Sequence, residues 1–288
     1  MNKLRINLNN QNIPNTFNIE NNNKENEGKN SLLNSTKKTN KSSNAKSKKT
    51  RNNTQNNKQK HSEQDSKKIT DIIFILDRSG SMSGLENDTI GGFNSMIKKQ
   101  KKENINDETF ITTVLFDNHL KTIHNRTPLN NVKTLTEKDY FVGGSTALFD
   151  AIGFTLNNHK TEIDKQNIDT KDNNTIVIIT TDGYENSSKE YNYKQIKDLI
   201  TTSKDKGWEF IFLGANINSE EFGNKIGIGV NNSIKYSASS VGTSIMFDEI
   251  SDCMSSIRKA KSSDCYDSIN IKSMFKKSMN YNDQFDEE

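Results

Sequence analysis

From Ile69 onward, short apolar runs alternate along the chain with amphipathic segments of helical length. This alternation is typical of βαβ units, in which helices connect the strands of a mainly parallel sheet. The runs Ile72–Leu76 and Ile176–Ile179 are apolar at every position, which favours central strands covered by helices on both faces. Strands are therefore predicted over residues 70–76, 109–116, 120–124, 175–181, 209–213 and 234–237.

The helices are predicted between and after these strands. In the last of them Met246, Ile250 and Met254 recur at helical spacing, so one face of that helix is expected to pack on the sheet. Only three residues separate the second and third strands, which predicts a hairpin. Together these patterns indicate an α/β fold with a mostly parallel sheet. The predicted helices cover residues 84–102, 147–163, 190–206, 219–226 and 243–261.

The first part of the chain has a different composition. Residues 1–66 contain 13 Lys or Arg, 5 acids and 19 Asn. Because the net charge of all 288 residues is only +3, this basic arm is attached to a mildly acidic body. Such a polar segment buries too little apolar surface to offset the entropy of ordering. We therefore expect a disordered basic arm at 1–67, a folded domain at 68–262 and a flexible acidic tail at 263–288. Nucleic-acid contact through the arm stays open, because Lys46–Arg51 is strongly basic.

Several classes of protein are disfavoured by the sequence. No apolar run approaches the roughly 18 to 20 residues of a membrane span, and the N-terminus lacks the apolar region of a secretory signal. Cys253 and Cys265 are too few for a disulfide scaffold and are interpreted as free thiols of a reducing compartment. The expected location is intracellular and cytoplasmic. The four histidines are scattered, and each is interpreted as a surface or loop residue.

Oxygen-bearing side chains follow two predicted central strands and open a helix between them. In an open α/β sheet, ligands bind beyond the carboxyl ends of the strands, so we expect these loops to converge there. Their oxygens could surround one hard cation, Mg²⁺ or Mn²⁺, and the absence of Cys and His from the set argues against zinc or copper. The candidate ligands are Asp77, Ser79, Ser81, Thr146 and Asp182.

The types of ligand in this set point to a function. Three hydroxyls are neutral, and only two carboxylates carry charge, so the cation would remain electrophilic with a vacant or water-filled position. Such an ion attracts a carboxylate from outside. The sequence therefore predicts binding to a protein partner that offers an Asp or Glu side chain.

Three segments of the chain resemble a known family. Asp77–Met82, Gly143–Ile152 and Thr181–Gly183 are similar to the three parts of the metal-ion-dependent adhesion site (MIDAS) of von Willebrand factor type A (VWA) domains. The resemblance covers residues 68–260, and the stretches at 180–186 and 208–216 are similar to single-domain members from bacteria and phages. It implies a Rossmann-like, three-layer α/β/α fold with about six strands, one of them an antiparallel edge strand.

The resemblance also implies roles for the candidate ligands. Ser79, Ser81 and Thr146 would bind the metal directly, and Asp77 and Asp182 would bind it directly or through water. The implied protein is a non-enzymatic, metal-dependent interaction module. The residues expected around its partner-binding rim are Tyr184, Glu185, Asn186 and Asn216.

Three alternatives are compared with this interpretation. The cation could be purely structural, in a scaffold or assembly protein, and nothing in the sequence separates this from partner binding. An Mg²⁺-dependent phosphatase would use Asp77 as a nucleophile, but it needs a general acid at position 79, where this chain has Ser. A serine hydrolase is disfavoured because the chain has no Gly-x-Ser-x-Gly elbow.

Overall fold

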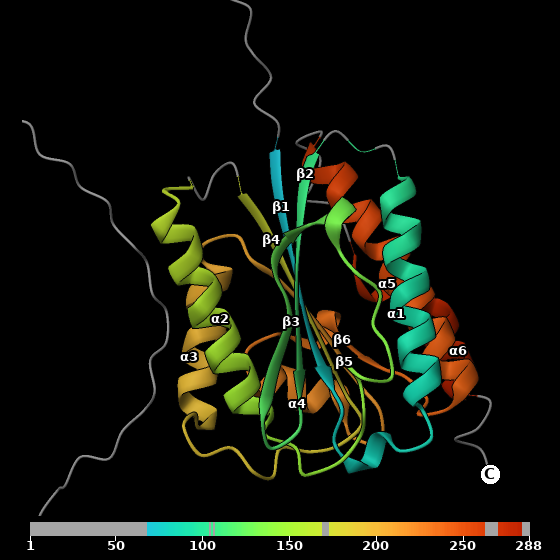
Figure 1. Ribbon diagram of the computed structural model, residues 1–288. Coiled ribbons are helices and arrows are strands. Elements are labelled where there is room, and N and C mark those ends of the chain that lie inside the picture. The colour runs from blue at the N-terminus through green and yellow to red at the C-terminus, as the bar shows by residue number, and fades with distance from the viewer. Residues whose placement is uncertain (1–67, 104, 106, 169–172, 263–269, 284–288) are drawn as a thin grey trace, which may run out of the picture. The chain divides into compact units, whose positions relative to one another are not determined.

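The computed structural model describes residues 68–103, 105, 107–168, 173–262 and 270–283. Within them, strands form a sheet in the order β3-β2-β1-β4-β5-β6 (Figure 1). Neighbouring strands are parallel except for β3, which pairs antiparallel with β2 at one edge. The predicted α/β fold with an antiparallel edge strand is confirmed. The strands are β1 (Lys68–Asp77), β2 (Asp107–Phe116), β3 (Leu120–Pro128), β4 (Asn173–Thr181), β5 (Glu209–Gly214) and β6 (Ser233–Lys235).

Helices cover both faces of the sheet and complete three layers (Figure 1): α1 (Glu86–Lys102), α5 (Ser240–Ser262) and α6 (Lys276–Asp283) on one face, and α2 (Leu148–Lys165), α3 (Tyr193–Lys204) and α4 (Ser219–Lys225) on the other. Each face has its own apolar core. Because successive side chains of a strand point to opposite faces, Phe74 of β1 enters the first core and Ile75 enters the second. Both side chains are fully buried, as the apolar runs predict.

The sheet contains a switch point between β1 and β4. The chain leaves β1 through a short 3₁₀ turn, η1 (Gly80–Met82), and α1 on one face, whereas it leaves β4 toward α3 on the opposite face. Such a divergence opens a crevice at the carboxyl ends of the two strands. Asp77 is the last residue of β1, and Asp182 directly follows β4, so both carboxylates stand at this crevice.

Helix α3 begins later than the sequence pattern predicts. The prediction starts at residue 190, but the helix starts at Tyr193. The Asn192 side chain accepts a hydrogen bond from the backbone N–H of Gln195, and the Gln195 side chain accepts one from the backbone N–H of Asn192. This capping box satisfies two backbone donors that a helix start leaves unpaired, and it fixes the boundary.

The prediction of a flexible tail over 263–288 is wrong for part of that range. Residues 270–283 contain a 3₁₀ turn, η5 (Lys272–Met274), and helix α6. Ile271 and Phe275 are buried in the core between the sheet and α5. The Glu249 carboxylate of α5 accepts hydrogen bonds from the backbone of Lys277 and Ser278 at the start of α6. A buried acceptor at a helix N-terminus and two apolar anchors thus hold this segment, while 263–269 and 284–288 lie outside the described residues.

The sequence analysis also predicts surface or loop histidines, a disordered arm at 1–67 and no membrane span. His124 and His159 are 6% and 4% exposed, so their interpretation as surface or loop residues is wrong. The predicted arm at 1–67 lies outside the described residues. Among the helices that the structure describes, none combines the length and apolarity that crossing a bilayer requires.

Candidate metal centre

Three loops meet at the crevice between β1 and β4. The Ser81 hydroxyl donates a hydrogen bond of 2.5 Å to Oδ1 of Asp182, which joins the loop after β1 to the loop after β4. The backbone N–H of Gly80 donates to the carbonyl of Gly144, at 3.1 Å, and so joins the first loop to the segment before α2. The structure thus places the loops side by side, as expected from their positions at the strand ends.

Asp77 is held rigidly at the base of the site. Its Oδ1 accepts a hydrogen bond of 2.7 Å from the backbone N–H of Ser79, and its Oδ2 accepts one of 2.6 Å from the Thr181 hydroxyl. Burial raises the pKa of Asp77 to about 6, because desolvation disfavours the charged form; the hydrogen bonds from Thr181 and Ser79 oppose this rise, and the nearby charge of Asp182 adds to it.

The hydroxyl groups line the same opening. Ser79 Oγ and Ser81 Oγ lie 3.1 Å apart. A Cβ added to Gly183 would lie 3.6 Å from Ser81 Oγ and 3.8 Å from Thr146 Oγ1, so both hydroxyls face Gly183 across the crevice. Ser79 and Thr146 are buried, whereas Ser81 is exposed. The site is therefore open to solvent on the side of Ser81.

The surroundings of the Asp182 carboxylate indicate whether these residues fit a cation. Its Oδ2 atom is buried and, among the described residues, has no hydrogen-bond partner. Burial also raises the pKa of Asp182. A buried carboxylate oxygen without a partner is costly, and a second buried carboxylate nearby adds repulsion. A hard cation between them would satisfy the free oxygen and offset both charges, so the residues present fit Mg²⁺ or Mn²⁺.

The described residues contain no group of three or more His, Cys, Asp or Glu side chains placed to hold a metal. A cation at this crevice would therefore depend on hydroxyl oxygens to complete its coordination.

A supporting shell of side chains was not predicted from the sequence. Arg78 forms a buried ion pair of 3.0 Å with Asp117, and Tyr140 donates a hydrogen bond of 2.6 Å to the backbone carbonyl of Asp77. The Arg78 guanidinium also lies 4.6 Å from the centre of the Phe141 ring. One signal was available for Asp117, which directly follows β2 in the same way that Asp182 directly follows β4.

The four predicted rim residues fall into two groups. Tyr184 and Asn216 are exposed and line the same groove, and Asn186 is exposed as well. The Glu185 carboxylate accepts hydrogen bonds from the backbone of Phe149, in the first turn of α2, and from Ser187 and Ser188. The Asn186 side chain accepts one of 2.9 Å from the backbone N–H of Thr146. Glu185 and Asn186 thus position the loop that carries Thr146.

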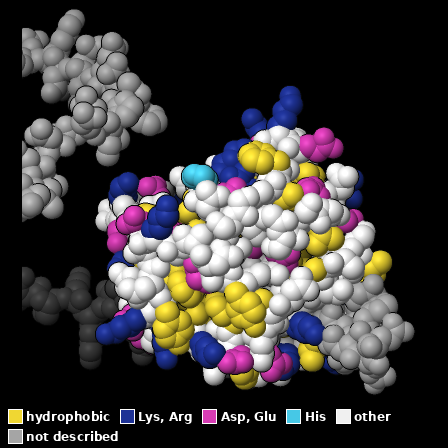
Figure 2. Space-filling model, turned by 90° about the horizontal axis from the view of Figure 1, so that it is seen from below, with side chains coloured by type: hydrophobic (Ala, Val, Ile, Leu, Met, Phe, Trp, Pro, Cys, Tyr) yellow, Lys and Arg dark blue, Asp and Glu magenta, His cyan; other side chains and the backbone are white. Residues whose placement is uncertain are grey.

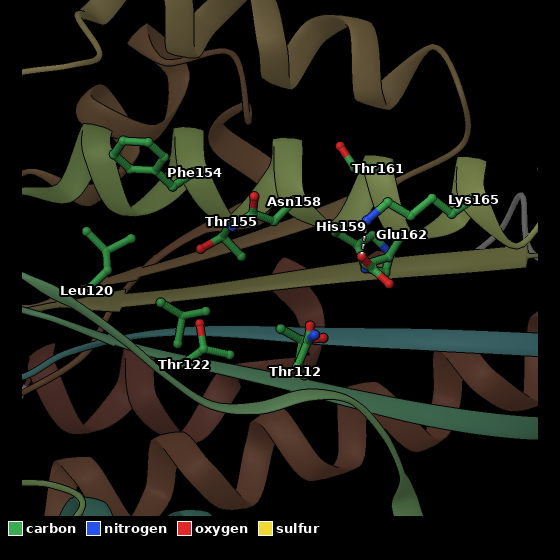
Figure 3. A pocket seen from close by; sticks show the side chains of 12 residues that line it. Thr112, Leu120, Thr122, Phe154, Thr155, Asn158, His159, Thr161, Glu162 and Lys165 are labelled. Atoms are coloured by element: carbon green, nitrogen blue, oxygen red, sulfur yellow. Dashed lines mark hydrogen bonds and ion pairs between the residues drawn. The ribbon is translucent and has the colours of Figure 1, made fainter. Parts of the chain in front are cut away.

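A cavity of about 640 Å³ lies elsewhere, between α2 and the β2–β3 hairpin (Figure 3). The charged side chains at its rim, Glu162 and Lys165, pair with each other at 3.0 Å. His159 lies at its inner end, with Nε2 3.8 Å from the Asp71 carboxylate. Burial, followed by the charge of Arg126, lowers the pKa of His159 to about 3, so the imidazole is neutral. This cavity shares no lining residue with the metal centre.

Comparisons with solved structures give matches of low sequence identity. Proximal thread matrix protein 1 of the mussel byssus is 16% identical (TM-score 0.44) over 68% of this chain and 47% of its own. The ArnB paralog from Sulfolobus acidocaldarius is 16% identical (0.40) over 65% and 45%. The von Willebrand factor domain of a type V pilus tip protein from Porphyromonas gingivalis is 10% identical (0.44) over 66% and 96%. This chain spans a little under half the length of the first two.

A search of curated protein sequences found no match. The family model of the von Willebrand factor type A domain matches residues 71–246, more than half of the chain. The matched range runs from β1 into α5 and includes all three loops of the crevice. The chain therefore belongs to the von Willebrand factor type A domain family.

Proposed function

We propose that the folded domain is a non-enzymatic module that binds a protein partner through a divalent cation, Mg²⁺ or Mn²⁺, held in a complete MIDAS. The observation that carries the proposal is Oδ2 of Asp182, which is buried and has no hydrogen-bond partner among the described residues. It lies in a crevice that hydroxyl oxygens share with the Asp77 carboxylate. The cation, when bound, supplies a Lewis-acidic position that accepts an outside carboxylate. The residues that would hold it are Asp77, Ser79, Ser81, Thr146 and Asp182.

The carboxylates and the hydroxyls would contribute to ion binding in different ways. Asp77 has both carboxylate oxygens engaged by Ser79 and Thr181, so it is fixed before any ion arrives. The hydroxyls are neutral and leave most of the ion's charge uncompensated. Because Ser81 is exposed, a carboxylate of a partner can approach from that side. The partner therefore offers an Asp or Glu side chain.

The surface around the crevice is suited to protein contact. Figure 2 views the face where the carboxyl ends of the parallel strands emerge. Its centre is mostly uncharged, hydrophobic side chains gather beside the centre, and charged side chains lie mainly toward the margin. An apolar area within a polar rim is the usual arrangement of a protein interface.

The phosphatase alternative conflicts with the surroundings of Asp77. Such an enzyme needs a general acid two residues after the nucleophile, and this position is Ser79 here, whose backbone N–H donates to Asp77. Asp77 is also only 1% exposed. A structural cation in a scaffold protein remains the alternative that an experiment must exclude.

The experiment titrates Mg²⁺, Mn²⁺ and, for comparison, Zn²⁺ into the full chain by calorimetry. Asp77→Ala should abolish Mg²⁺ and Mn²⁺ binding and keep the circular dichroism spectrum, whereas Asp198→Ala, an exposed acid on α3, should bind as the wild type does. The same proteins are then baits in native extract, with Mg²⁺ or with chelator. Metal binding without any metal-dependent partner would favour the structural cation.

A further inference from the structure

The cavity between α2 and the β2–β3 hairpin lies apart from the metal centre and takes no part in the proposed function. Its volume of about 640 Å³ falls within the range of about 300 to 1,000 Å³ that is typical of small-molecule sites. One wall comes from α2, and the other comes from β2 and β3 (Figure 3). The cavity is therefore a candidate for a second, separate binding site.

The hairpin is irregular where it forms the wall of this cavity. Two shifts of register interrupt the pairing of β2 with β3, one between Ile111 and Thr113 and one between Thr113 and Val114. Thr112 and Asn125 lie within the first of these shifts, and both line the cavity. Such bulges re-aim side chains and are over-represented beside functional sites. The irregular pairing thus coincides with a hydroxyl and an amide on the cavity wall.

Thr155 of α2 carries a buried hydroxyl that lacks a partner. The residue is 4% exposed and lines the cavity, and no described residue forms a hydrogen bond with its Oγ1. Figure 3 shows its side chain pointing from α2 toward the hairpin, while Thr122 extends from β3 into the same space. In the same helix the Thr161 hydroxyl is paired, because it donates to the carbonyl of Asn157. A molecule in the cavity can supply the partner that Thr155 lacks, and an unpaired buried hydroxyl is costly.

The lining of the cavity carries no uncompensated charge among the described residues. Its charged side chains, Glu162 and Lys165, pair with each other at 3.0 Å. His159 at the inner end is neutral, because burial lowers the pKa of its imidazole to about 3. An ionised ligand would lose its hydration on entering and would find no free opposite charge. The cavity therefore favours a neutral ligand.

The other side chains of the lining combine neutral polar groups with apolar surface. Hydroxyl and amide groups can both donate and accept hydrogen bonds. Phe154 adds an aromatic ring that is 38% exposed, and the ring is held in place because it meets the Tyr191 ring edge-on, with 5.2 Å between the centroids. Leu120 adds aliphatic surface. The neutral polar residues are Thr112, Thr122, Asn125, Thr155, Asn158 and Thr161.

These features together select one class of small molecule. A purely apolar ligand would leave the Thr155 hydroxyl unpaired, and an ionised ligand would lack a counter-charge. A sugar ring carries several hydroxyls on its edge, each of which can donate and accept, as the threonines can. The C–H groups on its faces pack on an aromatic ring. The cavity offers both kinds of contact.

We propose that this cavity binds a neutral sugar ring, either of a free saccharide or of the end residue of a glycan. The Thr155 hydroxyl hydrogen-bonds a hydroxyl of the sugar, and Phe154 and Leu120 contact its C–H groups. The binding does not need the cation, because no lining residue is a candidate metal ligand. The domain thus has a second ligand, which binds away from the crevice.

The test screens the full chain against neutral mono- and disaccharides by ligand-detected NMR and against an immobilised glycan array, both with chelator present. At least one neutral sugar should bind, whereas glucuronic acid, glucosamine and a neutral tripeptide should not. Signals from the array alone would identify a glycan as the source of the sugar, and signals from free sugars would identify a saccharide. Failure of every neutral sugar to bind, or binding of the charged sugars or the peptide alone, would overturn the proposal.

Variants tie the binding to the cavity. Thr155→Val keeps the volume and removes the hydroxyl, so the affinity for the sugar should fall about fivefold, the usual contribution of one hydrogen bond, whereas Thr155→Ser should bind nearly as the wild type does. Thr122→Trp fills the cavity from an exposed position and should abolish binding, and Thr202→Trp, at an exposed position on α3, is the matched control. Equal affinities of the two Thr155 variants, or unchanged binding by Thr122→Trp, would overturn the proposal and leave the metal-dependent function intact.

Discussion

The Ser81 hydroxyl donates a hydrogen bond of 2.5 Å to Asp182, although 101 positions separate the two residues in the sequence. This contact brings together the loops that follow two adjacent parallel strands, β1 and β4. It leaves one oxygen of Asp182 buried and unpartnered among the described residues. The contact therefore locates the candidate cation site and leaves a carboxylate oxygen of Asp182 to which a cation could bind.

Replacement of Thr146 separates metal binding from folding. Thr146→Val keeps the volume and removes the hydroxyl, so metal affinity should fall tenfold or more, since even outer-shell partners of a metal contribute about 10- to 100-fold. Thr146→Ser keeps the hydroxyl and should bind nearly as the wild type does. Calorimetry gives the affinities, and urea unfolding in chelator gives the stability. Equal affinities of the two variants would remove the Thr146 hydroxyl from the site.

Metal should stabilise the folded protein through linkage, because the unfolded chain has no preformed site. At a free Mg²⁺ concentration of about 100 times Kd, the free energy of unfolding should rise by about 2.7 kcal/mol. Thermal unfolding with Mg²⁺ and with chelator measures this change. In Asp77→Ala the difference should vanish, whereas a metal-induced rise of the same size in that variant would place the ion elsewhere.

His159 should make the stability depend on pH. The unfolded imidazole takes up a proton near pH 6.5, but the buried one does so only near pH 3, so the unfolded state binds more protons between these values. The free energy of unfolding should therefore fall as the pH falls below 6.5, by about 1.4 kcal/mol for each pH unit.

The variant His159→Gln isolates this effect from that of its neighbour Asp71, whose pKa burial raises. Between pH 7 and pH 5 it should lose about 2 kcal/mol less stability than the wild type in urea unfolding. His119→Gln is the matched control, because the His119 side chain is 77% exposed. Equal pH dependence of wild type and His159→Gln would show that the pKa of His159 is the same in the folded and unfolded states.

The C-terminal segment should contribute to stability. Phe275 is fully buried, so Phe275→Ala should cost about 3 to 5 kcal/mol in urea unfolding. Phe154→Ala, at a side chain 38% exposed, should cost much less. A negligible effect of Phe275→Ala would mean that α6 is not docked on α5 in solution.

The parts of this molecule that were predictable from sequence have local signals. The apolar runs in β1 and β4 specify central strands, and carboxylates directly after such strands must lie at one edge of a parallel sheet. The pairing of Ser81 with Asp182 follows from that rule once β1 and β4 are neighbours.

The missed features depend on contacts between distant segments. Helix α6 is short, and its start relies on Glu249 in another helix. Burial of His159 depends on the ring of Trp208, which it meets edge-on at 5.2 Å, and on the charged pair of Asp71 and Arg126. Glu185 resembles an exposed loop acid in the sequence, but it accepts backbone donors at the start of α2. No local pattern in the chain indicates such partners.

The most direct test of the central claim is a crystal of the full chain grown with Mn²⁺ and measured for anomalous scattering. The account predicts one anomalous peak in the crevice, in contact with oxygens of Ser79, Ser81 and Thr146 and next to Asp182. A crevice without a peak, in crystals soaked with enough Mn²⁺ to saturate the protein in solution, would contradict the account.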